Sequence, residues 1–208
     1  MTRHHLPISF LLSLLLGLYA CQGMKKDTPM DYKDYMAWMS DPSHGMVKEK
    51  RVNGLLLKVK YIPSDLAALK TKKKFQGSVA TDSSATFLLS IGPENELTHG
   101  SGDLMMADVK NFEEYKEKFN EMHFQLGEYA RLQSGPSVYE PTLFHLEPTY
   151  GLGKELTVTF VFSPKSDPRE FMGKRGYDFV FDDRFFNTGK SHFVFLQEDL
   201  QEIPRLKK

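Results

Sequence analysis

The stretch from Met46 to Ile62, MVKEKRVNGLLLKVKYI, decides the fold. Within it, Asn53-Gly54 separates two extended runs, residues 46–52 and 55–62. Both central residues of a type I′ turn need a positive φ, which Asn and Gly adopt more readily than other residues, so this dipeptide is a strong hairpin signal. Apolar residues recur at every second position of the later run, which indicates one buried face. The stretch therefore predicts a β-hairpin and, with it, an antiparallel sheet.

Two helices are predicted next to this hairpin. Before it, Thr28 can cap a helix that has Pro29 in its first position and ends at Asp41-Pro42. The apolar face of this helix is formed by Tyr32, Tyr35, Met36 and Met39. After the hairpin, Ser64 caps a short helix that runs to about Lys74. A short apolar strand then follows at residues 85–91.

The clearest helix signal covers residues 112 to about 133. Its apolar stripe consists of Phe112, Tyr115, Phe119, Met122, Leu126 and Tyr129, at steps of three and four residues. Asn111 is a good N-cap, Glu114 completes a capping box, and Gly135-Pro136 supplies a stop. We expect the stripe to pack across the protein's own sheet. The alternative is the seam of a coiled coil with a partner helix.

After Pro136 the chain reads as strands and turns. Strands are predicted at residues 142–147, 156–163, 177–181 and 191–196. Hairpins dominate, and no alternation of strand and helix indicates a parallel sheet. We therefore predict an α+β fold with one mainly antiparallel sheet of about six to seven strands. One long helix and two shorter ones are expected to pack on it.

The first twenty residues have the three parts of an export signal. Arg3 precedes an apolar stretch from Leu6 to Leu18, and small or neutral residues follow. This stretch is shorter than the about 20 residues that a membrane span needs. The residues Leu18-Tyr19-Ala20-Cys21 resemble the bacterial lipobox. The resemblance implies cleavage before Cys21, diacylglycerol on its sulfur and acylation of the new amino group.

Cys21 is the only cysteine of the chain, at the one place that lipidation requires. The alternative is an ordinary secretory signal in which Cys21 is an incidental small apolar residue. Two or three long acyl chains hold a protein on a bilayer almost permanently, because each buried methylene contributes about 0.8 kcal/mol. The predicted organisation is a cleaved leader at residues 1–20, a lipidated tether at 21–29 and one globular domain at 30–208.

The charge of the chain argues against nucleic acid as a partner. The chain has 27 basic and 27 acidic residues, and removal of the leader takes away only Arg3. The mature protein then carries 26 basic and 27 acidic residues, or a net charge of −1. Binding of nucleic acid demands a basic face. The bilayer, reached through acylated Cys21, and an envelope protein remain as the expected partners.

No motif predicts a cofactor or a metal. Gly189-Lys190-Ser191 matches the tail of a phosphate-binding loop, but Arg184 stands where the motif needs glycine, and a strand follows where it needs a helix. The mature chain has five histidines, none at the spacing of a metal site and none accompanied by a ligand cysteine. Of these, His145 and His192 lie on predicted strands and could meet across the sheet.

No catalytic residue is predicted either. Asp182 with Asp183, and Glu140 with Glu147, lie next to predicted strands and could serve glycoside hydrolysis at a suitable separation. Acidic residues at strand ends usually face water, and there is no Gly-x-Ser-x-Gly elbow.

The chain is rich in aromatic residues, with 16 Phe, 9 Tyr and 1 Trp. We expect them to fill the core and one sheet face. The alternative is an apolar groove for a lipid, a partner strand or a peptide. Trp38, near the tether, could instead enter the lipid headgroups.

Several stretches together look like small bacterial lipoproteins of the Bacteroidota type. These are the lipobox, YMAWMSDPSHGMVKEKRVNGLLLKVKYIP, NFEEYKEKF, PTYGLGKELTVTFVFSP and YDFVFDDRFFNTG. The resemblance supplies no catalytic residue and implies an outer-membrane setting. Gln22 is not the aspartate that retains enteric lipoproteins on the inner membrane, and Lys25 and Lys26 stand where surface-exported lipoproteins of that group carry acidic residues. We therefore expect the leaflet that faces the periplasm.

The expected function is a membrane-anchored, non-catalytic binding or scaffold domain. A carrier of lipids or other hydrophobic ligands is one alternative, and it predicts a deep cavity lined by Phe and Met. An envelope hydrolase is another, and it predicts Asp, Glu or His side chains that converge in a cleft.

Overall fold

The computed structural model describes residues 29–67, 84–95, 103–148, 154–164 and 176–207. The predicted leader, Cys21 and the tether up to residue 28 lie outside the described residues. So do His99 and the part of the predicted Ser64 helix beyond residue 67.

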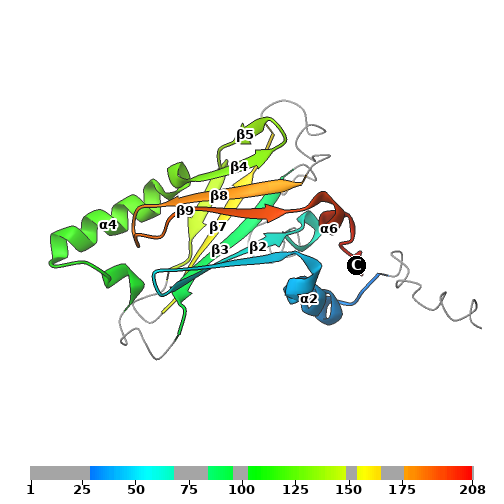
Figure 1. Ribbon diagram of the computed structural model, residues 1–208, viewed down its shortest axis with the longest axis horizontal. Helices are drawn as coiled ribbons and strands as arrows, with labels where there is room; N and C mark the ends of the chain where they lie inside the picture. Colours follow the sequence, from blue (N-terminus) through cyan, green and yellow to red (C-terminus); the bar gives the residue numbers. More distant parts are fainter. Residues whose placement is uncertain (1–28, 68–83, 96–102, 149–153, 165–175, 208) are drawn as a thin grey trace, which may run out of the picture.

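The described strands form two antiparallel sheets. The first contains β1 (Val47–Val52), β2 (Leu55–Ile62), β3 (Ala85–Pro93), β7 (Leu156–Phe162) and β6 (Leu143–Leu146), in that spatial order. The second contains β5 (Ser137–Tyr139), β4 (Ala130–Ser134), β8 (Tyr177–Asp183) and β9 (Gly189–Phe195). Figure 1 shows the second sheet lying over the first. The predicted α+β class and antiparallel pairing are confirmed, whereas the prediction of one sheet is wrong.

The predicted hairpin is present as β1 and β2. Asn53 and Gly54 have φ values of 53° and 75°, as a type I′ turn requires. Val52 lies opposite Leu55, and the register continues to Val47 opposite Lys60. The alternation of β2 is also confirmed, because Leu55, Leu57 and Val59 are buried.

Aromatic rings fill the space between the two sheets. The ring centroid of Phe87, on β3, lies 5.3 Å from those of Phe179 on β8 and Phe195 on β9. Phe160 and Phe162, on β7, lie 5.5 and 6.0 Å from Phe179. All five side chains are fully or almost fully buried. The inner face of the first sheet is thus covered by a second sheet and not by helices, because alternate aromatic residues of β8 and β9 provide a second apolar face.

The helix before the hairpin begins later than predicted. It is α2 (Tyr32–Ser40), and its N-cap is Asp31, whose side chain accepts a hydrogen bond from the Asp34 amide. It ends at Asp41, as predicted, and η2 (Pro42–His44) follows. Tyr35 and Met39 are buried in a second core cluster, together with Met46, Ile62 and Leu66.

The predicted long helix is shorter than expected. It is α4 (Phe112–Phe124), and its predicted N-cap is confirmed, because the Asn111 side chain accepts a hydrogen bond from the Glu114 amide. The Glu114 carboxylate accepts from the Asn111 side chain and the Lys110 amide, in place of the Asn111 backbone amide of a capping box. A 3₁₀ turn, η4 (Leu126–Tyr129), follows, and residues 130–134 form β4 and not the last turns of a helix. Alternate residues of β4 (Ala130, Leu132 and Ser134) are buried, so strand pairing with β5 and β8 overrides the helical pattern. The predicted helix stop, Gly135-Pro136, is the turn between β4 and β5.

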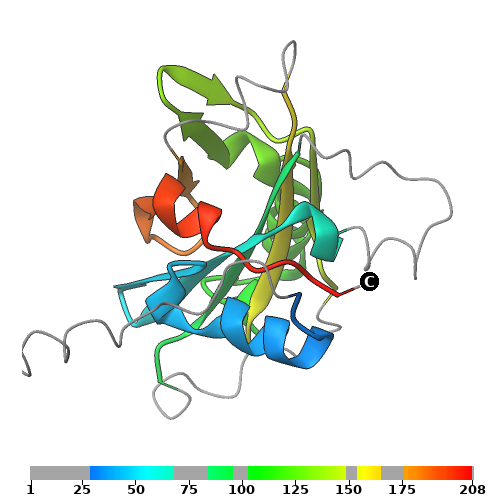
Figure 2. The ribbon, with the colours of Figure 1, turned by 90° about the vertical axis from the view of Figure 1, so that its right-hand side faces the viewer.

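Both ends of the described chain lie at the same end of the molecule. The Met30 amide donates to the Arg205 carbonyl at 2.9 Å, and the Lys207 amide donates to the Met30 carbonyl at 2.8 Å. A short helix, α6 (Gln197–Gln201), precedes this C-terminal segment. Figure 1 shows α2, α6 and the C-terminus at one end and α4 at the other. Figure 2 looks from the α2 end and shows β4 and β5 on the side away from α2.

The two sheets come together along one side of the molecule. The Lys50 ammonium group, on β1, donates to the Lys190 carbonyl and the Ser191 hydroxyl of β9, at 3.2 and 3.1 Å. The Asn53 side chain donates to the Asn187 carbonyl at 2.7 Å. The edge strands β1 and β9 therefore shield each other, which leaves β6 and β5 as the edges on the other side.

Candidate functional site

Helix α4 exposes most of its aromatic residues. Only Met122 of this helix is buried, whereas Phe112 and Phe124 are 73% and 76% exposed. Phe112, Tyr115, Phe119 and His123 stack in a row along one flank, with Phe119 and His123 only 3.8 Å apart between ring centroids. The predicted packing of the stripe is thus confirmed only in part, because Met122 and Leu126 are buried and Tyr115 and Tyr129 pack against the core, whereas Phe112 and Phe119 are exposed. An exposed row of this kind marks a surface available for binding.

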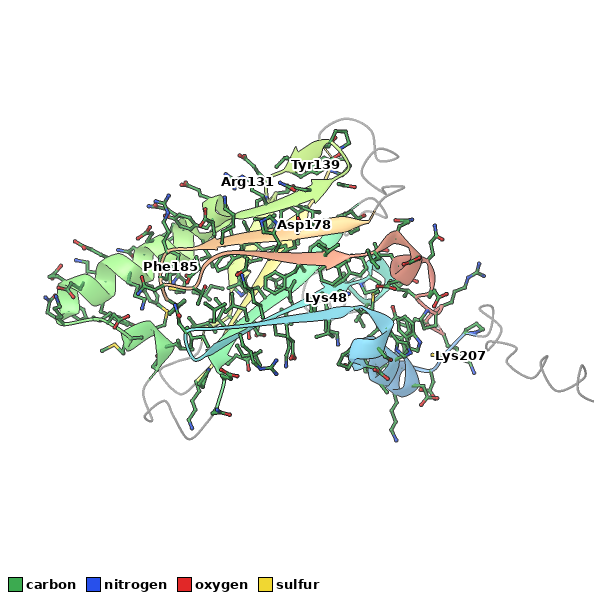
Figure 3. All side chains as sticks on the ribbon, viewed as in Figure 1. Lys48, Arg131, Tyr139, Asp178, Phe185 and Lys207 are labelled. Atoms are coloured by element: carbon green, nitrogen blue, oxygen red, sulfur yellow. The ribbon has the colours of Figure 1, made fainter. Side chains whose placement is uncertain are left out.

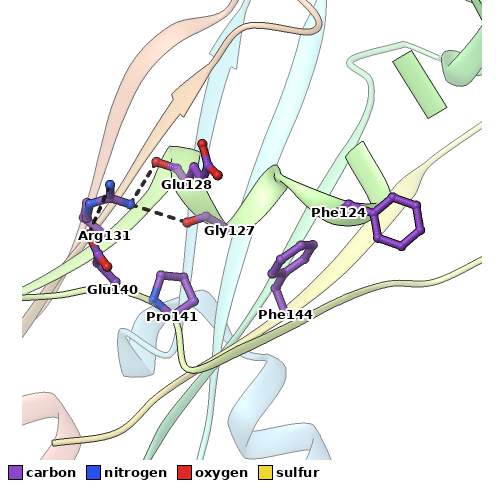
Figure 4. Close-up of a pocket in the computed structure, with 7 residues that line it drawn as sticks. All are labelled: Phe124, Gly127, Glu128, Arg131, Glu140, Pro141 and Phe144. Carbon is purple, nitrogen blue, oxygen red and sulfur yellow. Dashed lines mark hydrogen bonds and ion pairs between the residues drawn. The ribbon is translucent and has the colours of Figure 1, made fainter. Parts of the chain in front are cut away.

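A pocket lies between the end of α4 and strand β6. It encloses about 210 Å³ and is lined by Phe124, Gly127, Glu128, Arg131, Glu140, Pro141 and Phe144 (Figure 4). Two phenyl rings and a proline form its apolar part, and three charged residues form its polar part. Gly127 packs closely on Phe144, because a Cβ atom at this glycine would lie 2.7 Å from the ring. The close approach brings η4 and β6 together and so shapes the pocket.

Arg131 is fixed by the chain around it. One guanidinium nitrogen, Nη1, donates to the carbonyls of Glu128 and Ala130, both at 2.8 Å, and to that of Gly127 at 3.4 Å (Figure 4). The other terminal nitrogen, Nη2, lies 3.6 Å from the Glu140 carboxylate. Figure 3 places Arg131 away from Lys207 along the length of the molecule. Arg131 thus pairs with Glu140, whereas Glu128 has no ion-pair partner among the described residues.

A second pocket, of about 290 Å³, lies on the other side of α4. It is lined by Ala107, Asp108, Val109, Glu114, Glu117, Lys118, Glu121, Arg184 and Phe185. The Lys118 ammonium group donates to the Ala107 carbonyl at 2.8 Å and lies over the Phe186 ring, and burial lowers its pKa. The Tyr129 hydroxyl donates to Glu121 at 2.5 Å, which raises the pKa of Tyr129. These contacts attach α4 to the body of the protein and leave an acidic surface beside it.

His145 and His192 do not meet. His145 lies on β6 of the first sheet, and His192 lies on β9 of the second. The predicted pairing is wrong because the strands belong to different sheets. His192 instead has its Nδ1 atom 2.8 Å from the Asp178 carboxylate, on the outer face of the second sheet. Among the described residues, no group of three or more His, Cys, Asp or Glu side chains could hold a metal ion.

The predicted carboxylate pairs do not converge. Asp182 is paired with Lys190 at 3.7 Å on the surface. Asp183 is buried and accepts hydrogen bonds from the Phe185, Phe186 and Thr188 amides, so it holds the β8–β9 turn. Glu140 is paired with Arg131, and Glu147 faces the solvent. These side chains have structural or surface roles.

The rings elsewhere have their own structural roles. The Trp38 and His44 rings stack at 4.1 Å, and the His44 Nδ1 atom lies 2.9 Å from the Trp38 carbonyl. Trp38 is therefore partly covered by the protein itself. Whether it contacts lipid stays a prediction.

Sequence reasoning missed the pocket residues Phe124, Arg131 and Phe144. Phe124 lies outside the apolar stripe of α4. An aromatic residue on the polar side of a helix is the sequence signal that could have marked it as a binding residue. The other two come from strands, and only the fold brings them together with Phe124.

In the described part of the chain, no helix is long and apolar enough to cross a membrane. Comparisons with protein-family models, with curated proteins and with solved structures found no match to this chain.

Proposed function

We propose that this chain is a lipid-anchored protein of the bacterial envelope that works by binding another protein. The observation that carries the binding function is the apolar surface at α4. There, Phe112, Phe119 and Phe124 are exposed on one helix, and Phe124 lines a pocket with Phe144. Among the described residues, rings packed against one another between the sheets do not favour the alternative of a lipid carrier. The predicted carboxylate pairs lie apart there, which does not favour a hydrolase.

The proposed anchor fits the placement of this surface. A tether from Cys21 to residue 29 would join the folded body at the α2 end, beside the C-terminal segment. Nine extended residues reach about 30 Å. The exposed rings of α4 lie at the other end of the long axis and would face away from the anchoring membrane. We propose the outer membrane, with the folded domain in the periplasm.

The anchor is tested by replacing Cys21 with Ser in cells that express the full chain. We expect the variant to leave the membrane fraction and to lose incorporation of labelled palmitate. A matched Ser13→Ala variant of the leader should behave as the wild type. Membrane attachment of Cys21→Ser would contradict the proposed anchor.

Binding is tested by placing a photo-crosslinking amino acid at Phe112, Phe119 or Phe124 in the lipidated protein. Tyr32 and Val194, both exposed but on other elements, are the controls. We expect one protein to be cross-linked from the α4 positions and not from the controls. Equal cross-linking from all five positions would contradict a binding surface at α4.

A further inference from the structure

The four sheet edges differ in how they are protected. β1 and β9 shield each other through Lys50, and β5 has only three residues. β6 pairs with β7 on one side, and no described strand pairs with its other side. Its sequence, Leu-Phe-His-Leu, has no lysine, carboxylate or proline, although proteins usually protect free edges with such residues. Within the described residues, the edge of β6 is therefore available to a further strand.

The register shows which backbone groups face this free side. The Glu147 amide donates to the Thr157 carbonyl at 2.8 Å, so Glu147 belongs to a hydrogen-bonded pair with β7. Hydrogen-bonded and non-bonded positions alternate along an antiparallel pair. The amide and carbonyl groups of Phe144 and Leu146 consequently point away from β7. Among the described residues, nothing accepts from or donates to them.

Side chains next to this edge provide an anchor for an incoming strand. Phe144 lines the pocket with Phe124 and Pro141, and Leu143, on the opposite face of β6, is 60% exposed. The pocket measures about 210 Å³. Pockets for drug-sized ligands are larger, at about 300 Å³ or more, so a single side chain fits this one better.

Charge indicates which strand fits. The pocket lining carries Glu128, Glu140 and Arg131, and Arg131 is held by Glu140 and by backbone carbonyls. The two carboxylates thus outnumber the one cation of the lining, and Glu128 has no ion-pair partner among the described residues. A basic residue beside the apolar anchor would meet these carboxylates. A second copy of this chain would instead bring two acidic rims together.

We propose that β6 accepts an extended segment of a partner protein as an added strand. The segment places one aromatic or branched apolar side chain in the pocket and a basic residue beside it. This inference rests on the proposed binding function and specifies its mode, in which backbone hydrogen bonds provide affinity and the pocket provides selectivity.

The test uses a synthetic probe on the purified, uniformly ¹⁵N-labelled protein. The probe is the capped peptide Thr-Lys-Thr-Phe-Thr-Val-Thr-Lys, whose Lys, Phe and Val side chains share one face of a strand. We expect it to slow amide hydrogen exchange at Phe144 and Leu146 by about tenfold or more. Replacing its lysines with glutamate, or its phenylalanine with serine, should weaken binding about tenfold. Two further peptides carry N-methyl groups on alternate backbone nitrogens, and in one of them the methyl groups face β6. Only that peptide should fail to protect the Phe144 and Leu146 amides.

Protein variants complete the test. Leu143→Lys should weaken binding of the peptide about tenfold, whereas Val194→Lys, a similarly exposed change on β9, should have no effect. Absence of protection at Phe144 and Leu146 with every peptide would overturn the inference, as would equal binding of the fully N-methylated peptide. A dimer formed through β6 in sedimentation experiments would also overturn it. If strand addition fails while cross-linking from α4 persists, the proposed binding function survives and only its mode is wrong.

Discussion

Single residues show how closely the parts of this protein fit. Asp183 is the clearest case, because its buried carboxylate accepts three backbone N–H groups and the Thr188 hydroxyl. Its sequence neighbour Asp182 only pairs with Lys190 at the surface. Two adjacent and identical residues thus have unequal roles, since a strand turns them to opposite faces.

We expect Asp183→Ala to lower the free energy of unfolding by about 3 kcal/mol, because buried donors lose a charged acceptor. Asp182→Ala should cost less than about 1 kcal/mol, as an exposed ion pair contributes little. Urea denaturation followed by circular dichroism measures both. Similar losses for the two variants would show that Asp183 does not hold the turn.

Gly127 gives a second residue-scale prediction. A Cβ atom there would press on the Phe144 ring at 2.7 Å, so Gly127→Ala should destabilise the protein by about 1–3 kcal/mol through overpacking. The matched change Gly92→Ala places its Cβ atom 3.4 Å from the nearest atom and should cost much less. Urea denaturation of each variant measures the two losses of stability. A neutral Gly127→Ala variant would indicate that η4 and β6 can move apart.

At the scale of elements, α4 is attached by few buried residues. Met122 is buried, whereas Phe112 and Phe124 point into solvent. We expect Met122→Ala to cost about 2–5 kcal/mol, while Phe112→Ser and Phe124→Ser change stability by less than about 0.5 kcal/mol. Thermal unfolding of the three variants makes the comparison. A large loss in either Phe variant would mean that these rings support the fold and are not kept for binding.

The same element shows how far sequence reasoning reaches. Local signals sufficed for the β1–β2 hairpin, the cap at Asn111 and the strands from β6 onward, because turn and capping chemistry depend on adjacent residues. The end of α4 was not predictable, since Leu126 and Tyr129 continue its helical spacing while β4 is formed by pairing with β8, about fifty residues later. The pocket was missed for the same reason, as Phe124 and Phe144 meet only in the folded chain.

At the scale of the whole molecule, three tyrosines lie in or between the two core clusters, and the half-buried Tyr61 packs against both. Tyr35 belongs to α2, Tyr61 to β2 and Tyr177 to β8, and the Tyr61 and Tyr177 rings lie 6.1 Å apart. Burial raises the pKa of Tyr61 to about 12 and raises the pKa of Tyr35 and Tyr177 further. These residues make the stability of the entire fold sensitive to alkali.

The sign of this dependence follows from proton binding. An unfolded chain loses its tyrosine protons near pH 10, whereas the folded chain keeps these three to a higher pH. The unfolded state then binds fewer protons, so the free energy of unfolding falls as pH rises from about 10 toward 12. Urea titrations at several alkaline pH values measure this decrease, and tyrosinate absorbance follows loss of the tyrosine protons. Tyr61→Phe should make the free energy of unfolding fall less steeply with pH. An unchanged pH dependence in this variant would contradict a contribution from Tyr61.

The Met30 bridge to the C-terminal segment has a mechanical consequence. If Cys21 anchors the chain and a partner pulls on β6, the pulling force is transmitted through the sheets to Met30, where the tether joins the folded domain. The two hydrogen bonds of Met30 then share the load between both chain ends, so that the N-terminal segment cannot peel away alone. Deleting the last residues from Arg205 onward would remove this clamp and should lower the force at which the domain begins to unravel.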